Sequence, residues 1–166
     1  MKLVREHLSF ERTDNPLRNM GIGRRVKIEK WLDEMGVKNY TINDDFTIDI
    51  KENVDLSNKY LRSFPPFIKF RNVGGSFFCD SNQLTSLEGC PQSVGGYFSC
   101  ESNQLTSLEG CPQSVGRDFS CHNNQLTSLE GCPQSVGRDF FCSNNKKKFT
   151  EKEVKKFCNV KGEIIV

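Results

Sequence analysis

Apolar residues recur along this chain with a fixed period of 21 residues, and this period is the dominant pattern of the sequence. Four columns of residues keep it: Phe77, Phe98, Phe119 and Phe140; Cys79, Cys100, Cys121 and Cys142; Cys90, Cys111 and Cys132; and Leu84, Leu105 and Leu126. Three full units and the start of a fourth indicate internal duplication. A unit this short cannot bury its own apolar face, so the units must stack on one another. The period therefore predicts a solenoid.

Within each unit, the pattern predicts one short strand followed by an extended return. Phe77 and Cys79 alternate with outward residues at the period of two that is typical of a strand. The Cys90-Pro91 pair then disfavours a helix, because the residue before a proline avoids the α region. We expect the strands of successive units to lie parallel, about 4.8 Å apart.

These residues resemble the leucine-rich repeat. The pattern F-x-C-x-x-N-x-L is similar to the L-x-L-x-x-N-x-L core of that family, and L-T-S-L resembles the L-T-S-L-P stretch of its short bacterial class. The resemblance covers residues 54–145. Phe and Cys stand in place of aliphatic residues, and Glu-Gly-Cys-Pro stands where the bacterial class has Leu-Pro. Because of these departures, the resemblance does not define the backbone geometry on the convex side of the solenoid.

The resemblance also implies a role for the repeated asparagines. Asn82, Asn103, Asn124 and Asn145 should turn inward and bond the backbone of neighbouring turns, since buried backbone groups need hydrogen-bond partners. The columns headed by Phe77, Leu84 and Leu87 should form the core.

The segments outside the clear repeats are predicted to be caps. Leu56, Leu61 and Phe64 stand 23 residues before Cys79, Leu84 and Leu87, so the solenoid is predicted to begin with a degenerate unit at residue 54. Atypical terminal units are expected, because they shield the stack from water. We therefore divide the chain into an N-terminal peptide and linker (1–23), an N-terminal cap (24–53), the solenoid (54–145) and a C-terminal cap (146–166).

The N-terminal cap is predicted to be a helix followed by a hairpin. Residues 25–35 have Val26, Trp31, Leu32 and Met35 on one face, and Gly36 ends the helix. Residues 40–42 and 46–50 alternate like strands around a turn at 43–45.

The C-terminal cap is predicted to open a short helix with a capping box at residues 150–153 and to end in a strand over 164–166. The predicted fold class is α+β: a leucine-rich-repeat-like parallel β solenoid with a helix and hairpin cap at the N-terminus and a helix cap at the C-terminus.

Composition adds eight cysteines and the absence of alanine, which disfavours a helical bundle. The shortest cysteine spacing, Cys90 to Cys100, leaves nine residues between, unlike the close pairs of zinc sites. Disulfides between turns would require an oxidising compartment. We expect the cysteines to act as small buried hydrophobic residues, with no metal and no cofactor, although disulfides or metal along a thiol column are the alternatives.

No catalytic motif accompanies the repeats. His7 and His122 are the two histidines, and His122 shares its slot in the unit with Asp80, Glu101 and Ser143, which marks a solvent position. No phosphate-binding loop, nucleophile elbow or zinc-protease motif occurs. We therefore expect a protein that is not an enzyme.

Charge separates along the chain. The net charge of +2 is divided into +3 over residues 1–72, −5 over 73–145 and +4 over 146–166. An acidic solenoid makes nucleic acid an unsuitable partner. No apolar run approaches the length of a membrane span, and no secretory leader opens the chain, so we expect a cytoplasmic protein that binds neither nucleic acid nor membrane.

Differences between the units fall at positions that point outward from the predicted strands, whereas Q-L-T-S-L-E-G-C-P-Q-S-V-G repeats without change in three units. In a leucine-rich-repeat solenoid these variable positions lie on the concave face, the usual partner surface. The candidate partner-binding residues are Ser76, Phe78, Asp80, Tyr97, Ser99, Glu101, Asp118, Ser120, His122, Asp139 and Phe141. The alternative is that these are solvent positions that tolerate change.

The leading hypothesis is a non-enzymatic module that holds a protein partner, host or viral, on the concave face. This hypothesis assigns no oligomeric state. Its cysteine-bearing repeats resemble small proteins encoded by bacteriophages, and residues 1–11 resemble the peptides that open many tailed-phage proteins. The alternative hypothesis is a structural virion or assembly component that docks through this peptide. The location would be the host cytoplasm in the first case and the virion in the second.

Overall fold

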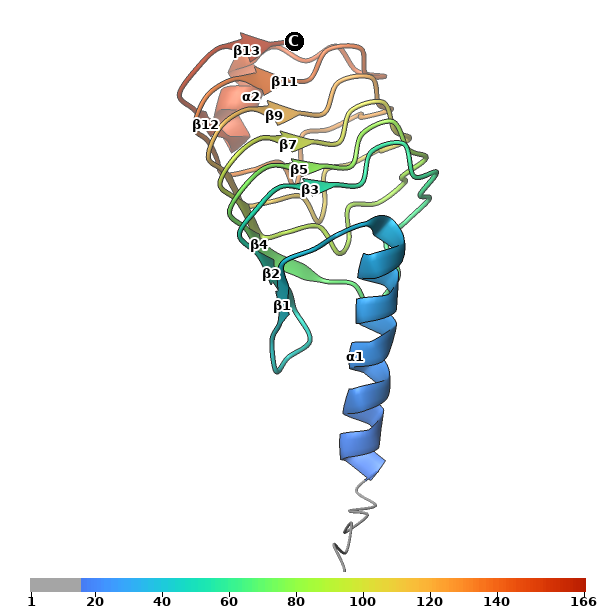
Figure 1. Ribbon diagram of the computed structural model, residues 1–166. Helices are drawn as coiled ribbons and strands as arrows, with labels where there is room; N and C mark the ends of the chain where they lie inside the picture. The colour runs from blue at the N-terminus through green and yellow to red at the C-terminus, as the bar shows by residue number, and fades with distance from the viewer. Residues whose placement is uncertain (1–15) are drawn as a thin grey trace, which may run out of the picture.

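The computed structural model describes the backbone of residues 16–166 and the side chains of residues 21–166. Residues 48–166 form a stack of six turns in which each turn contributes one strand to each of two parallel sheets (Figure 1). The predicted solenoid is confirmed, and so are its two caps. Residues 1–11, which carry the resemblance to phage peptides, lie outside the described residues.

The first sheet, which we call sheet B, contains the strands predicted from the repeats. Its order is β13-β11-β9-β7-β5-β3. The strands are β3 (Val54–Asp55), β5 (Phe77–Phe78), β7 (Phe98–Ser99), β9 (Phe119–Ser120), β11 (Phe140–Phe141) and β13 (Ile164–Ile165). Val54 pairs with Phe77, which confirms the degenerate first unit and its spacing of 23 residues.

The second sheet, sheet A, is formed by the return segments of the units, together with the hairpin of the N-terminal cap. Its order is β1-β2-β4-β6-β8-β10-β12, parallel except for the antiparallel β1–β2 pair. The strands are β1 (Tyr40–Ile42), β2 (Ile48–Ile50), β4 (Phe70–Val73), β6 (Ser93–Val94), β8 (Ser114–Val115), β10 (Ser135–Val136) and β12 (Asn159–Val160). The extended return after Cys90-Pro91 is therefore itself a strand, with Val94 buried and Ser93 facing outward.

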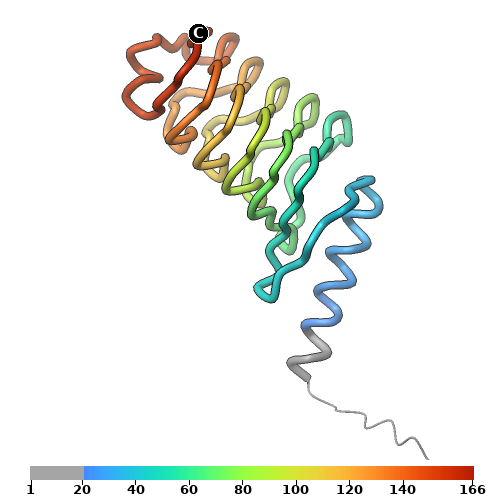
Figure 2. The backbone as a smooth tube through the Cα atoms, turned by 60° about the vertical axis from the view of Figure 1, so that its left-hand side comes forward, coloured from blue at the N-terminus to red at the C-terminus, as the bar shows by residue number. Residues whose placement is uncertain are grey.

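The N-terminal cap is a long helix, α1 (Pro16–Met35), followed by the β1–β2 hairpin (Figure 2). The prediction of a linker through residue 23 is wrong over residues 16–23, which are helical. Proline suits the first position of a helix, and the cost of a glycine inside a helix, about 1 kcal/mol, does not prevent one. Gly36 ends the helix with a φ of 79°, as predicted.

The buried face of α1 differs by one residue from the prediction. Ile28 and Leu32 are fully buried and Trp31 nearly so, whereas Val26 is 55% exposed. Ile28, Trp31, Leu32 and Met35 follow the i, i+3, i+4, i+7 spacing of one helical face, and Val26 lies about 200° away from Ile28.

At the opposite end, α2 (Glu151–Phe157) begins at the predicted capping box. The Thr150 hydroxyl accepts a hydrogen bond from the Glu153 backbone N–H, and the Glu153 carboxylate accepts one from the Thr150 N–H at 2.9 Å. Val154 is buried under the last turn, and β13 supplies the predicted final strand. The helix therefore forms part of the sixth turn.

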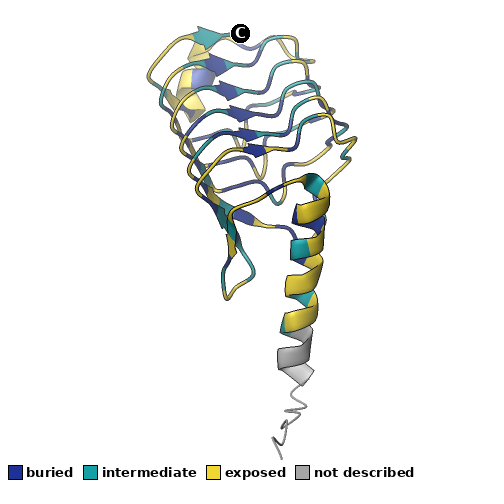
Figure 3. Ribbon diagram, viewed as in Figure 1, coloured by how far each residue is buried: buried dark blue, intermediate teal, exposed yellow. Residues whose placement is uncertain are grey.

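A column of aromatic rings fills the core beneath sheet B. Phe77 and Phe98 stack with centroids 5.8 Å apart and planes 8° apart, and Phe98 stacks on Phe119 at 5.6 Å. Phe64 continues the column toward Trp31 of α1, at 6.3 Å. Figure 3 shows buried residues recurring turn by turn along the strands of sheet B. One continuous apolar core therefore runs from the helix cap through the repeats.

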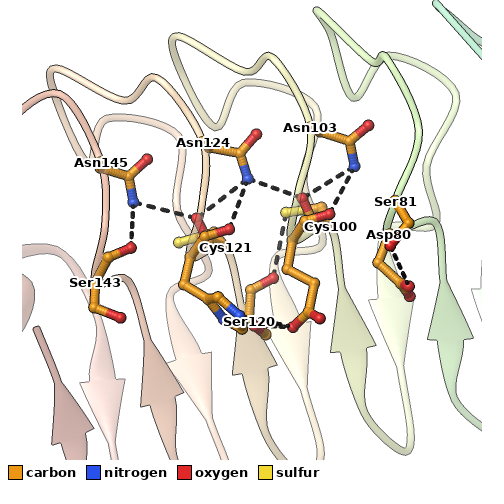
Figure 4. A network of polar contacts seen from close by, with 11 residues as sticks. Asp80, Ser81, Cys100, Asn103, Ser120, Cys121, Asn124, Ser143 and Asn145 are labelled. Carbon is orange, nitrogen blue, oxygen red and sulfur yellow. Dashed lines mark hydrogen bonds and ion pairs between the residues drawn. The ribbon is translucent and has the colours of Figure 1, made fainter.

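Asparagines join the turns within this core, as predicted (Figure 4). The amide of Asn103 donates to the Cys79 carbonyl of the preceding turn at 3.0 Å and to the Cys100 carbonyl of its own turn at 3.2 Å. Its side-chain oxygen accepts from the Leu84 N–H at 2.8 Å. Asn124 repeats these contacts one turn later. Each asparagine thus supplies partners to backbone groups that neither sheet ladder reaches.

Glycines hold the turns close at the corner between the sheets. A Cβ built on Gly95 would lie 2.2 Å from the Gly74 carbonyl oxygen, and one on Gly116 would lie 2.2 Å from the Gly95 carbonyl oxygen. Gly137 would meet Gly116 in the same way, at 2.1 Å. The backbones pass so closely here that the column excludes every side chain.

Replacing Asn124 by alanine should destabilise the fold by about 3 kcal/mol, because the buried Leu105 N–H and Cys100 carbonyl lose their partner. Asn124→Asp, which keeps the shape but loses the amide donor, should also destabilise it. Gln92→Ala, at an exposed position, is the control and should have little effect. Chemical denaturation measures the free energy of unfolding, and wild-type stability in Asn124→Asp would contradict the assigned hydrogen bonds.

Gly116→Ala should lower the stability by about 1–3 kcal/mol, since its new methyl group must displace the neighbouring backbone. The matched change Gly23→Ala should have the opposite sign. Gly23 lies inside α1, where a new Cβ would have nothing within 4 Å, so alanine should favour the helix by about 0.5–1 kcal/mol. Melting temperatures followed by circular dichroism compare the two, and a tolerated Gly116→Ala would refute the close backbone approach.

Candidate functional site

The outward face of sheet B carries a groove of about 360 Å³, which we call the sheet B groove. Nine of the eleven residues predicted from unit-to-unit variation line it: Phe78, Asp80, Tyr97, Ser99, Glu101, Asp118, Ser120, His122 and Phe141. The tenth lining residue, Phe98, belongs to the buried column beneath. The face that the sequence analysis expected to be concave is thus the one on which the groove lies.

The strand register explains how residues far apart in sequence meet here. Phe78, Ser99, Ser120 and Phe141 occupy successive turns at the same register position. Since side chains alternate across a strand, residues two positions before and two positions after them form parallel columns on the same face. Two large rings therefore stand at the ends of the middle column, with two small hydroxyl side chains between them.

The other two predicted residues do not line the groove, and each binds backbone instead. The Ser76 hydroxyl accepts from the Tyr97 N–H at 3.1 Å, and the Asp139 carboxylate accepts from the Glu163 N–H at 2.8 Å. Asp118 does both, lining the groove and accepting from the Asp139 N–H at 3.2 Å. This column therefore helps to connect the turns as well as to shape one wall.

The opposite wall, formed by Glu101 and His122, contacts the Ser120 hydroxyl of the middle column. The Ser120 hydroxyl lies 2.8 Å from His122 Nδ1 and 3.1 Å from the Glu101 carboxylate, and that carboxylate lies 3.3 Å from His122 Nε2. In a hydrolytic triad, the imidazole separates the hydroxyl from the carboxylate. Here all three contact one another, so the arrangement differs from that of a triad.

Two arginines lie at the border of the groove. The Arg117 guanidinium lies 5.5 Å from the centroid of the Tyr97 ring, and Arg138 Nε lies 3.7 Å from an oxygen of Asp118. Neither arginine lines the groove itself. Arg138 thus offsets the charge of Asp118, and Arg117 places a positive charge beside the Tyr97 ring.

The cysteines lie in the core, away from the groove. All eight are free thiols, and seven of them are buried, with Cys132 half-buried. The Cys79 thiol donates to the Ser99 carbonyl of the next turn at 3.3 Å, and that of Cys111 donates to the Gly131 carbonyl at 3.0 Å. The predicted role as small buried residues is confirmed, and each of these thiols adds a weak hydrogen bond between turns.

Burial keeps these thiols protonated. It raises the pKa of Cys100 and Cys121 well above the usual value, and it raises the pKa of Cys132 to about 12 and of Cys158 to about 11. Cys158 lies close enough to Cys132 for its charge to affect that thiol. Cys158 lies outside the 21-residue period, because α2 lengthens the last turn.

Neither a metal site nor a membrane-spanning helix is found among the described residues. Across residues 21–166, no three histidine, cysteine or acidic side chains gather where they could hold a metal ion. In the same part of the chain, no helix has the length and apolar character needed to cross a bilayer.

Native protein should react only slowly with a thiol reagent such as Ellman's reagent at pH 8, because a raised pKa leaves few thiolates and burial blocks access. Unfolding in guanidinium should release all eight thiols. Cys132 should react first, because it alone of the eight thiols is half-buried and access limits the reaction, and Cys132→Ser should remove that first phase. Fast reaction of several thiols in the native protein would contradict the buried columns.

Comparison with known proteins finds no match: no family model, no curated protein and no solved structure is similar enough to this chain to be assigned to it.

Proposed function

We propose that this chain is a non-enzymatic binding module that holds a protein partner on the outward face of sheet B. The observation that carries the proposal is the position of the differences between repeats. The units differ at the slots headed by Gly75, Ser76, Phe78, Asp80 and Ser81, which lie in β5 or beside it. Three of these slots supply the walls and floor of the sheet B groove.

The rest of the solvent-facing surface gives the contrast that supports this interpretation. Apart from two glycine slots, six other slots hold exposed or half-buried residues and are identical in all three units; they begin at Gln83, Thr85, Ser86, Glu88, Gln92 and Ser93. If exposed positions simply tolerated change, differences would be spread over these slots too. Change confined to the strands of sheet B and the residues beside them, with three of the five slots lining the groove, favours selection for binding over tolerance.

The composition of the groove supports a protein ligand. Aromatic side chains supply large contact areas at low entropic cost and are enriched where interfaces bury most of their energy. Phe78, Tyr97 and Phe141 line the groove, surrounded by carboxylates and hydroxyls. This pairing of aromatic anchors with a polar border is typical of partner surfaces.

The proposal predicts that the triple change Phe78→Ser, Tyr97→Ser and Phe141→Ser weakens partner binding by at least about tenfold, since three anchors are lost. A tagged wild-type chain would first recover the partner from the source cells, and the purified pair would then be measured by calorimetry. The matched control, Gln92→Ser with Gln113→Ser and Gln134→Ser, changes three exposed residues outside sheet B and should bind as the wild type does.

Circular dichroism checks that both triple variants keep the fold. Unchanged affinity in a folded groove variant would refute the proposal, and so would an equal loss in the control.

A further inference from the structure

Two phenylalanines set the ends of the sheet B groove. Phe78 and Phe141 occupy the same column three turns apart, a distance of about 14 Å at the usual strand spacing. Ser99 and Ser120 lie between them and form a low floor. A volume of about 360 Å³ is near the lower limit for ligand pockets and suits a single long side chain.

The lining of this space carries negative charge. Asp80, Glu101 and Asp118 contribute carboxylates, whereas no lysine or arginine is among the lining residues. The three carboxylates differ in how far neighbouring positive or polar groups offset their charge. Asp118 has Arg138 at 3.7 Å, and Glu101 contacts His122 and Ser120. Across residues 21–166, no ion pair involves Asp80, whose carboxylate has Ser81 Oγ at 3.5 Å.

Like charges face Asp80 from the turns on both sides. Burial raises the pKa of Asp80, and the nearby carboxylates of Glu101 and Asp55 raise it further. The Phe78 end of the groove therefore has an aromatic ring beside an unbalanced row of acidic side chains. The Tyr97 and Asp118 side, by contrast, already has guanidinium groups from the chain itself.

We propose that the Phe78 end of the sheet B groove receives an arginine side chain of the protein partner, whose guanidinium pairs with Asp80 and Glu101. This inference rests on the proposed function and adds the chemistry that the groove recognises. A guanidinium is planar, stacks on aromatic faces and bonds carboxylates with two parallel donors. The same face already holds Arg117 against the Tyr97 ring, and the groove repeats that pairing with a partner's residue.

The probe for this inference is acetyl-Gly-Arg-Gly-amide, titrated into isotope-labelled full-length protein and followed by NMR. We expect millimolar binding that shifts the backbone signals of Phe78, Asp80 and Tyr97 and weakens as salt is added. The same peptide with citrulline, which keeps the shape but lacks the charge, should bind about tenfold more weakly. No shift with the arginine peptide at 10 mM (about ten times the expected dissociation constant) would overturn the inference, as would equal binding of citrulline.

A matched pair of double variants tests the carboxylates. Asp80→Asn with Glu101→Gln should reduce binding of the arginine peptide about tenfold. Glu109→Gln with Glu130→Gln removes the same charge from exposed positions outside the groove and should leave binding unchanged. Equal binding by the two double variants would overturn the inference.

The partner itself separates this inference from the proposed function. If the aromatic triple variant loses the partner while Asp80→Asn with Glu101→Gln retains it, the binding face stands and the arginine assignment fails. If both variants retain the partner, both proposals fail.

Discussion

Each buried asparagine bonds two neighbouring turns, and the sheet B groove exists because those turns are stacked in register. The Asn103 side chain donates a hydrogen bond to the Cys79 carbonyl and accepts one from the Leu84 N–H, both of the preceding turn. A shift of one turn against the next would leave these backbone groups buried without partners, which costs far more than a lost surface contact. Because these hydrogen bonds hold the turns in register, Phe78, Ser99, Ser120 and Phe141 are aligned in one row.

Stacking in register brings equivalent residues of successive turns together. This contact stabilises the fold for some types of side chain and destabilises it for others. Phenylalanines and thiols gain from it, since apolar groups pack and buried thiols reach carbonyls of the next turn. Like charges in one column repel. The repeated Glu88, Glu109 and Glu130 are exposed, where water and salt screen them. On sheet B the column after the strand reads Asp80, Glu101, His122 and Ser143, so the acidic run stops after two turns.

The same variation that relieves repulsion also shapes the groove. His122 contacts Glu101, and the two central turns carry Ser99 and Ser120 where the outer turns carry phenylalanine. Smaller side chains between larger ones produce a hollow on a surface that would otherwise be a flat row of rings. A few substitutions in a duplicated unit are therefore enough to make a groove, while the buried positions stay unchanged because the stack depends on them.

Local signals in the sequence were sufficient for much of this structure. The 21-residue period, the inward asparagines, the Gly36 helix end and the Thr150 capping box each depend on residues near one another or on strict repetition, and each was predicted from them. The positions that line the groove could also be named, because outward residues follow from strand alternation. Whether they bind a partner depends on chemistry outside the chain.

Other features depend on distances between turns, which a linear pattern does not contain. The second sheet arises because Ser93–Val94 and its repeats come within hydrogen-bonding distance once sheet B is stacked. Packing against the core selects Ile28 over Val26, and it buries Cys158, which lies outside the 21-residue period. The balance of charge around Asp80 likewise appears only when Asp55 and Glu101 lie on either side of it. Repetition along the chain thus predicts which residues form columns, and three-dimensional packing decides which columns meet.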